Sequence, residues 1–155
     1  MEILFYCLER QSVEDILPGL LERTLERGWR AIVRTDSAER MNALDTHLWT
    51  WSEQSFLAHG TPETGFASRQ PVYLTTGNEN PNRADVLFLA GGEWPADWSA
   101  PDVAQFVRVV ILFNGQDADI LSRAGASWRG AQRSGHSATF WRQTASGKWQ
   151  QEKPA

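Results

Sequence analysis

Four side chains in this sequence are of kinds that often catalyse reactions or bind metals: Cys7, His47, His59 and His136. A nucleophile needs a base beside it, and a zinc site needs several ligands at short, regular spacing. None of the three histidines has an acidic or cysteine residue at metal-ligand spacing. Cys7 falls inside a strongly apolar segment, where a thiol is usually buried and inert. We therefore expect no catalytic residue and no metal site.

Glycine-rich loops that hold phosphates are also missing. The sequence contains no G-x-x-x-x-G-K-[ST] motif, no G-x-G-x-x-G after an expected strand and no G-x-S-x-G elbow. These patterns place a nucleotide or a nucleophile in many α/β proteins, so we expect no cofactor. Catalytic residues brought together from distant segments would escape a motif search. A small nucleotide-handling α/β enzyme therefore stays open as an alternative.

Segment 117–133 carries the arginines best placed to bind a partner. Arg123, Arg129 and Arg133 fall on one side of an expected helix, and no acidic residue follows Asp119 there. Small residues between the arginines leave their guanidinium groups accessible and open a shallow groove. The other side of the helix is an apolar stripe, formed by Ile120, Leu121, Ala124, Trp128 and Ala131.

This pattern suits an acidic peptide that carries an aromatic side chain. Arginine can bind a carboxylate through two parallel hydrogen bonds. Trp128 lies at the margin of the stripe, and Phe113 ends the preceding strand; both could contact an apolar anchor of such a peptide. The plainer alternative is a helix that packs through one face and exposes the other to water.

The apolar pattern also predicts the elements that position this helix. A continuous apolar run at 2–8 indicates a strand buried on both faces. A first helix is expected to begin near Glu14 or Asp15, with Pro18 in its first turn and Gly28 after its end. Ser37 is expected to cap a second helix, whose buried residues are Met41, Leu44 and Leu48. Further strands are predicted at 29–34, 70–74, 84–89, 107–113 and 137–142, with loops at 52–70 and 91–103.

Strands that alternate with helices indicate an α/β fold. We expect a single-domain, Rossmann-like, mostly parallel sheet flanked by helices, without a nucleotide-binding loop. This domain would span residues 1–142, and residues 143–155 would form a polar C-terminal tail.

Composition limits the possible functions. The 155 residues suit one domain, and the net charge of −4 disfavours general affinity for nucleic acid. A single cysteine excludes an internal disulfide. The first residues are too short and too acidic for a signal peptide, and no apolar run is long enough to span a membrane. We therefore expect a cytoplasmic protein that does not contact membranes.

A second apolar segment, Ser55–His59, lies in an expected loop shortly after Trp49 and Trp51. Phe56 and Leu57 could fill the core of the domain, or they could form an exposed patch for a partner protein. The segment Trp94–Trp98 presents the same choice, and there we expect packing.

Several of these segments together resemble one protein family. They are Phe5-Tyr6-Cys7-Leu8, the join from Glu26 to Arg30, Leu48-Trp49, Ser55–His59 and Trp128-Arg129. In this order and spacing they resemble the chi subunit of bacterial DNA polymerase III, an accessory protein of the clamp loader. The resemblance implies a non-catalytic replication protein with an α/β fold. Such a protein links the clamp loader to the acidic, Phe-ending C-terminal tail of single-stranded-DNA-binding protein.

The resemblance also assigns two binding surfaces. Trp128 and Arg129, with Phe113, match the surface that binds the tail, and helix geometry adds Arg123 and Arg133. The second surface would bind the psi subunit, or another clamp-loader or replication protein. Phe56 matches the family there, with Leu57 and Trp49 nearby, although Ala58 stands where proline is common.

DNA would then be contacted mainly through partner proteins. The remaining alternative is a direct single-stranded-DNA binder that uses arginine and tryptophan side chains.

Overall fold

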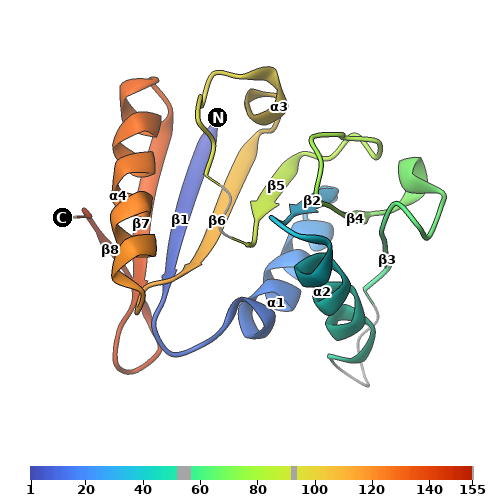
Figure 1. Cartoon of the computed structure of the whole chain (residues 1–155), viewed down its shortest axis with the longest axis horizontal. Helices are drawn as coiled ribbons and strands as arrows, with labels where there is room; N and C mark the ends of the chain where they lie inside the picture. The colour runs from blue at the N-terminus through green and yellow to red at the C-terminus, as the bar shows by residue number, and fades with distance from the viewer. Residues whose placement is uncertain (52–56, 92–93, 155) are drawn as a thin grey trace.

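A computed structural model describes residues 1–51, 57–91 and 94–154 of the chain. Helices and strands alternate along most of its length (Figure 1). In chain order the elements are β1 (Glu2–Leu8), α1 (Val13–Glu26), β2 (Ala31–Arg34), α2 (Ala38–Thr50), β3 (His59–Gly60), the 3-10 turn η1 (Ala67–Arg69), β4 (Val72–Thr75), β5 (Val86–Leu89), α3 (Pro101–Ala104), β6 (Arg108–Asn114), α4 (Ala118–Arg133), β7 (Ser137–Gln143) and β8 (Trp149–Glu152).

The described strands form one sheet in the order β3-β4-β2-β5-β6-β1-β7-β8. Neighbouring strands run parallel except β7 and β8, which pair antiparallel. The predicted α/β class and the mostly parallel sheet are therefore confirmed. Figure 1 shows α4 along β7 and β1, with α1 and α2 beside the other half of the sheet.

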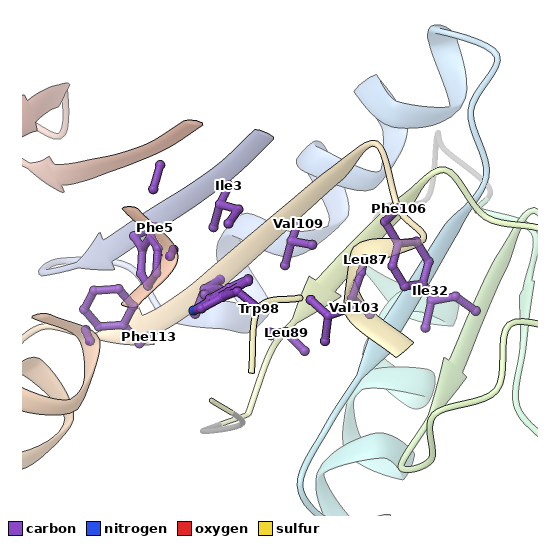
Figure 2. Close-up of a cluster of buried hydrophobic side chains, with 14 of the residues drawn as sticks. Ile3, Phe5, Ile32, Leu87, Leu89, Trp98, Val103, Phe106, Val109 and Phe113 are labelled. Carbon is purple, nitrogen blue, oxygen red and sulfur yellow. The ribbon is translucent and has the colours of Figure 1, made fainter. Parts of the chain in front are cut away.

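Two hydrophobic clusters hold these layers together, one on each face of the sheet. The cluster beneath α4 and α3 contains Phe5, Phe113, Phe140 and Trp98. Figure 2 shows Trp98 near the middle of this cluster, with Phe5 and Phe113 on one side and Val103 on the other. The second cluster lies beneath α1 and α2 and contains the three apolar residues predicted for the second helix, Met41, Leu44 and Leu48.

Helix α1 starts earlier than we expected. The Ser12 hydroxyl accepts a hydrogen bond from the Asp15 amide, and the Asp15 carboxylate accepts one from the Ser12 amide. This capping box sets the first helical residue at Val13. Pro18 consequently lies inside the helix, beyond its first turn, and the prediction for it was wrong. Gly28 follows the helix with a positive φ of 80°, as predicted.

Strand β1 is not buried on both faces, which corrects a second expectation. Ile3, Phe5 and Cys7 are fully buried towards α4. Leu4 and Tyr6 point to the other face and remain partly exposed. The reason is that α1 packs on β2 and β6 instead of on β1.

Short elements escaped the sequence prediction. The expected loops contain β3, η1 and α3, each of four residues or fewer. Within 143–155, expected to be a polar tail, Trp149–Glu152 forms β8 at the edge of the sheet. Arg142 helps to hold it there, because its guanidinium contacts Glu152 at 3.0 Å and Glu9 at 2.6 Å.

Candidate protein-binding site

Helix α4 presents the arginines, and its ends are fixed by local sequence. The Asp117 carboxylate accepts hydrogen bonds from the backbone amides of Asp119 and Ile120, which caps the start of the helix. Gly135 adopts a positive φ of 83° just after its end. The helix predicted for segment 117–133 is therefore confirmed.

The buried and exposed sides of α4 agree with the predicted stripe. Ala124 and Ala131 are buried against the sheet, and Ile120, Leu121 and Trp128 pack partly buried against the same cluster. The three arginines Arg123, Arg129 and Arg133 are exposed.

A groove of about 510 Å³ runs between α4 and the segment Trp94–Trp98. Its floor on α4 is made of Ala126, Ser127 and Gly130, residues whose short side chains leave the space open. Arg123 and Arg133 also line it. They are ten residues apart, about 15 Å along the helix axis, which is enough for an extended peptide of four or five residues.

Trp98 anchors the opposite wall of this groove. Its side chain is 3% exposed, and its indole Nε1 donates a hydrogen bond to the Ser127 carbonyl at 3.1 Å. The His136 ring lies 3.2 Å from the Trp98 carbonyl. The packing that we expected for this segment is therefore found at Trp98, while Trp94 and Pro95 are only partly buried.

The groove has a positive charge. Neither Arg123 nor Arg133 forms an ion pair with a described residue, and no described lining residue is acidic. An anionic ligand would therefore not have to displace an existing carboxylate there.

Phe113 lies beneath the surface rather than on it. It is 3% exposed, and its ring packs against Trp94 and Phe140 at centroid distances of 5.7 Å each. Phe113 also lines a second hollow of about 410 Å³. Trp94 and Arg123 line both this hollow and the groove. Phe113 thus supports Trp94 from below.

Trp128 and Arg129 do not line the groove. Trp128 lies one turn before Gln132, whose side chain reaches the Ala138 carbonyl of β7, so Trp128 lies on the β7 side of the helix. The predicted tail-binding residues are therefore divided. Arg123 and Arg133 border the groove, Phe113 lies below it, and Trp128 and Arg129 lie further around α4.

The second predicted surface is only partly accessible. Trp49 is 51% exposed, and its ring lies 4.4 Å from the ring of buried His59. Leu57 is 3% exposed and belongs to the core beneath α2; of the two roles considered for it, the structure shows the core one. Phe56 lies outside the described residues.

His59 does have an acidic neighbour, which its sequence spacing did not reveal. Its Nε2 lies 3.0 Å from the Asp45 carboxylate, and its Nδ1 lies 2.6 Å from the Leu57 carbonyl. The contact ties the end of α2 to β3 and does not form a metal site. In the part of the chain that the structure describes, no three histidine, cysteine or acidic residues are grouped to hold a metal ion.

Cys7 is a structural residue. It is fully buried, and burial raises the pKa of its thiol from 9.0 to about 11, with nearby Glu9 acting in the same direction and Arg142 against it. A thiol with this pKa stays protonated at neutral pH and is a poor nucleophile.

The turn after β1 is where a Rossmann-like domain usually binds phosphate through backbone amides. Here the amides of Glu9 and Arg10 both donate hydrogen bonds to the side-chain oxygen of Gln143, each at 3.3 Å. Gln143 comes from β7 and is buried. The Gln143 side chain therefore already accepts the hydrogen bonds of the backbone amides that would otherwise bind a phosphate.

These features define an α/β protein with a mostly parallel sheet, in which Gln143 occupies the backbone amides after β1. The comparison with known families is specific: residues 1–139 match the family model described as DNA polymerase III chi subunit, HolC. The chain belongs to this family. Its members are accessory subunits of DNA polymerase III in DNA replication, and they are not catalytic themselves.

A curated relative agrees with the family match. The chain is 28% identical, over 90 residues, to the "Probable DNA polymerase III subunit chi" of Rickettsia prowazekii (strain Madrid E). The aligned part covers 58% of this chain and 50% of that protein, so the chain spans about half the length of this relative. None of the described helices is long and apolar enough to cross a membrane.

The prediction from sequence did not include the wall of the groove that Trp94–Trp98 forms. Of the two roles considered for Trp94–Trp98, packing was the expected one, and the segment was not paired with α4, although the small residues of α4 already indicated a groove. Pairing them requires knowing that Trp98 docks onto Ser127, a contact between residues 29 positions apart that no periodicity reveals.

Proposed function

We propose that this chain binds the acidic, Phe-ending C-terminal tail of single-stranded-DNA-binding protein and links that protein to the clamp loader. It would do so on the outer surface of α4, in the bacterial cytoplasm. The observation that carries this proposal is the unpaired, basic groove between α4 and Trp94–Trp98, together with membership of the chi family.

The chemistry of the two partners is complementary. Arg123 and Arg133 would pair with acidic side chains or the terminal carboxylate of the tail, and Arg129 would extend the positive surface. The apolar ring of the terminal phenylalanine needs a binding pocket that shields it from water. The groove beside Trp94 offers one, and the partly buried face of Trp128 offers another.

A peptide of about nine residues that ends in the acidic tail provides the direct test, titrated at two salt concentrations. We expect saturable binding that weakens with added salt and disappears when the terminal phenylalanine is removed. Arg129→Ala should weaken the complex by about 1–3 kcal/mol, the range for a charge-assisted hydrogen bond. Arg69→Ala, at an exposed arginine in η1, is the matched control and should leave affinity unchanged.

A second variant distinguishes the two candidate pockets, the groove beside Trp94 and the face of Trp128. Arg123→Ala with Arg133→Ala should weaken tail binding more than Arg129→Ala if the groove holds the peptide, and less if the Trp128 side does. Unchanged affinity in both variants would contradict the proposal as a whole.

We also propose a second partner at the surface formed by Trp49 next to His59; the predicted contact residue Phe56 lies outside the described residues. The observation behind it is the exposed Trp49, since large exposed aromatic side chains are common at protein interfaces. The partner would be a psi subunit or another clamp-loader or replication protein. Trp49→Ala should impair its binding in a pull-down while tail binding stays intact. Loss of both activities would indicate a misfolded protein.

A further inference from the structure

The β1, β7 and β8 end of the sheet has one face that α4 covers and one that no described helix covers. On the covered side, Phe5 and Phe140 pack beneath α4. Side chains alternate along a strand, so Tyr6 and Trp141 point to the opposite side. They are register partners on β1 and β7. Helix α1 packs on β2 and β6 and leaves this area open; we call it the open sheet face.

Three aromatic side chains line the open sheet face across three neighbouring strands. Trp149 of β8 lies edge-on to Tyr6, with ring centroids 4.9 Å apart. Trp141 belongs to neither core cluster, and its indole Nε1 donates a hydrogen bond to Thr139 at 2.9 Å. All three rings are partly exposed. A row of aromatic rings on an open sheet is a surface on which unpaired bases can stack.

Arginines border this face where it meets α1. A cavity of about 350 Å³ begins at Leu4 and Tyr6 and is lined by Arg23, Arg27 and Arg108. Two of these cations contact the Trp29 ring, whose centroid lies 4.2 Å from the Arg27 guanidinium and 5.1 Å from that of Arg108. The three guanidinium groups are thus gathered beside Tyr6, at one margin of the open sheet face.

Two carboxylates oppose this charge. Glu2 pairs with Arg108 at 2.5 Å, and Glu26 also lines the cavity. Arg23 and Arg27 are exposed and form no ion pair with a described residue. Arg23 lies in the last turn of α1 and Arg27 caps its end, four residues later, so both can reach one extended anionic backbone. The patch keeps a positive charge although the whole chain carries −4.

We propose that the open sheet face binds single-stranded DNA directly. Tyr6, Trp141 and Trp149 stack against bases, and Arg23, Arg27 and Arg108 contact the phosphates. Rings spread over three strands fit a row of bases better than a peptide, which needs a groove with a single deep anchor pocket. The site lies on the opposite side of the sheet from α4, so this inference is independent of the tail-binding proposal.

The test is the fluorescence anisotropy of a labelled oligothymidylate of about 15 nucleotides, titrated with the full chain at low salt. We expect saturable binding whose log affinity falls with log salt at a slope of about −2, as for three phosphate contacts. Arg23→Glu with Arg27→Glu should weaken binding at least about tenfold. Trp141→Ala should weaken it about fivefold or more, the effect of losing one stacked base.

The matched control reverses two charges on the other side of the sheet. Arg123→Glu with Arg133→Glu changes the net charge by the same amount and should keep DNA affinity within about twofold, while it disrupts the groove beside α4. Equal losses in both double variants would show a bulk charge effect and overturn the proposal. Absence of DNA binding by the unmodified chain at low salt would also overturn it, as would unchanged affinity in both Trp141→Ala and the Arg23/Arg27 variant.

A further outcome separates the possible ligands. If the Arg23/Arg27 variant loses binding to an acidic peptide while the unmodified chain ignores DNA, the face is a peptide site and the present proposal is wrong. Each variant is first compared with the unmodified chain by its thermal unfolding midpoint. These positions are exposed or partly exposed, so we expect the fold to be retained.

Discussion

The two faces of β1 show how differently a single strand can be used. Towards α4, Ile3, Phe5 and Cys7 are 0% exposed. Towards α1, Leu4 and Tyr6 stay partly exposed, although they are as apolar as their neighbours. The cause lies outside the strand, because α4 covers β1 whereas α1 packs on β2 and β6. An unbroken apolar run can therefore contain one core face and one surface.

The two surfaces proposed for binding also differ in the size of their side chains. The outer side of α4 offers short side chains, a groove and arginines. The open sheet face offers large aromatic rings, with arginines at its margin. The first arrangement suits a narrow chain with one anchor, and the second suits flat rings in a row. A difference in side-chain size thus separates two kinds of ligand on opposite sides of one sheet.

Truncating one residue on each face of β1 gives the largest expected contrast. Phe5→Ala should lower the free energy of unfolding by about 3–5 kcal/mol, because it leaves a cavity among packed rings. Phe5 lies 6.1 Å from the Trp98 ring and 6.2 Å from that of Phe140, centroid to centroid. Tyr6→Ala should cost only about 1 kcal/mol, since the side chain is partly exposed. Urea unfolding measures both values.

Phe5→Leu serves as the control and should cost much less than Phe5→Ala, because it keeps most of the buried volume. Similar losses for Phe5→Ala and Tyr6→Ala would mean that both faces of β1 are core, as the sequence alone suggested.

Much of the fold was predictable because its signals are local. The cap at Ser37, the glycine after α1, and the helical spacing of Met41, Leu44 and Leu48 all depend on neighbouring residues. Local signals also misled at Pro18, where the capping box formed by Ser12 and Asp15 was overlooked. Strand β8 was not predicted because its residues are mostly polar, and they form a strand only by pairing with β7.

The sites were less predictable than the fold. Helical spacing placed Arg123 and Arg133 on one side of α4, and both border the groove. The same spacing could not show that Phe113 is covered by Trp94, or that the segment 94–98 forms the opposite wall. Gln143 accepts hydrogen bonds from the backbone amides after β1, which lie more than 130 positions away in the sequence. Such contacts follow from sheet order, which no single segment encodes.

The pH dependence of stability should sharpen the contrast on the buried face. The pKa of the Cys7 thiol is raised to about 11 in the folded chain, against 9.0 when exposed. Above pH 9 the unfolded chain loses this proton while the folded chain keeps it, so stability falls as pH rises. Between pH 8 and 10 the loss should be about 1 kcal/mol, measured by urea unfolding at each pH.

Cys7→Ala removes this thiol and should clearly reduce the slope, leaving a smaller one near pH 10 where exposed tyrosines begin to ionise. The range ends at pH 10 because the pKa values of Tyr6 and Tyr73 are also raised by burial and would add an effect of the same sign at higher pH. An unchanged slope in Cys7→Ala would show that the thiol is not the group responsible.

The smallest expected effect concerns the open face, where Tyr6 and Trp149 form an edge-on pair. Such aromatic pairs contribute about 0.5–1.5 kcal/mol beyond the area they bury. A double-mutant cycle of Tyr6→Leu and Trp149→Leu, followed by urea unfolding, should give a coupling energy in that range. Coupling near zero would mean that β8 is held mainly by Arg142 and its two carboxylates, leaving both rings free to stack on a ligand. A coupling well above this range would place the pair in the core and weaken the case for an open face.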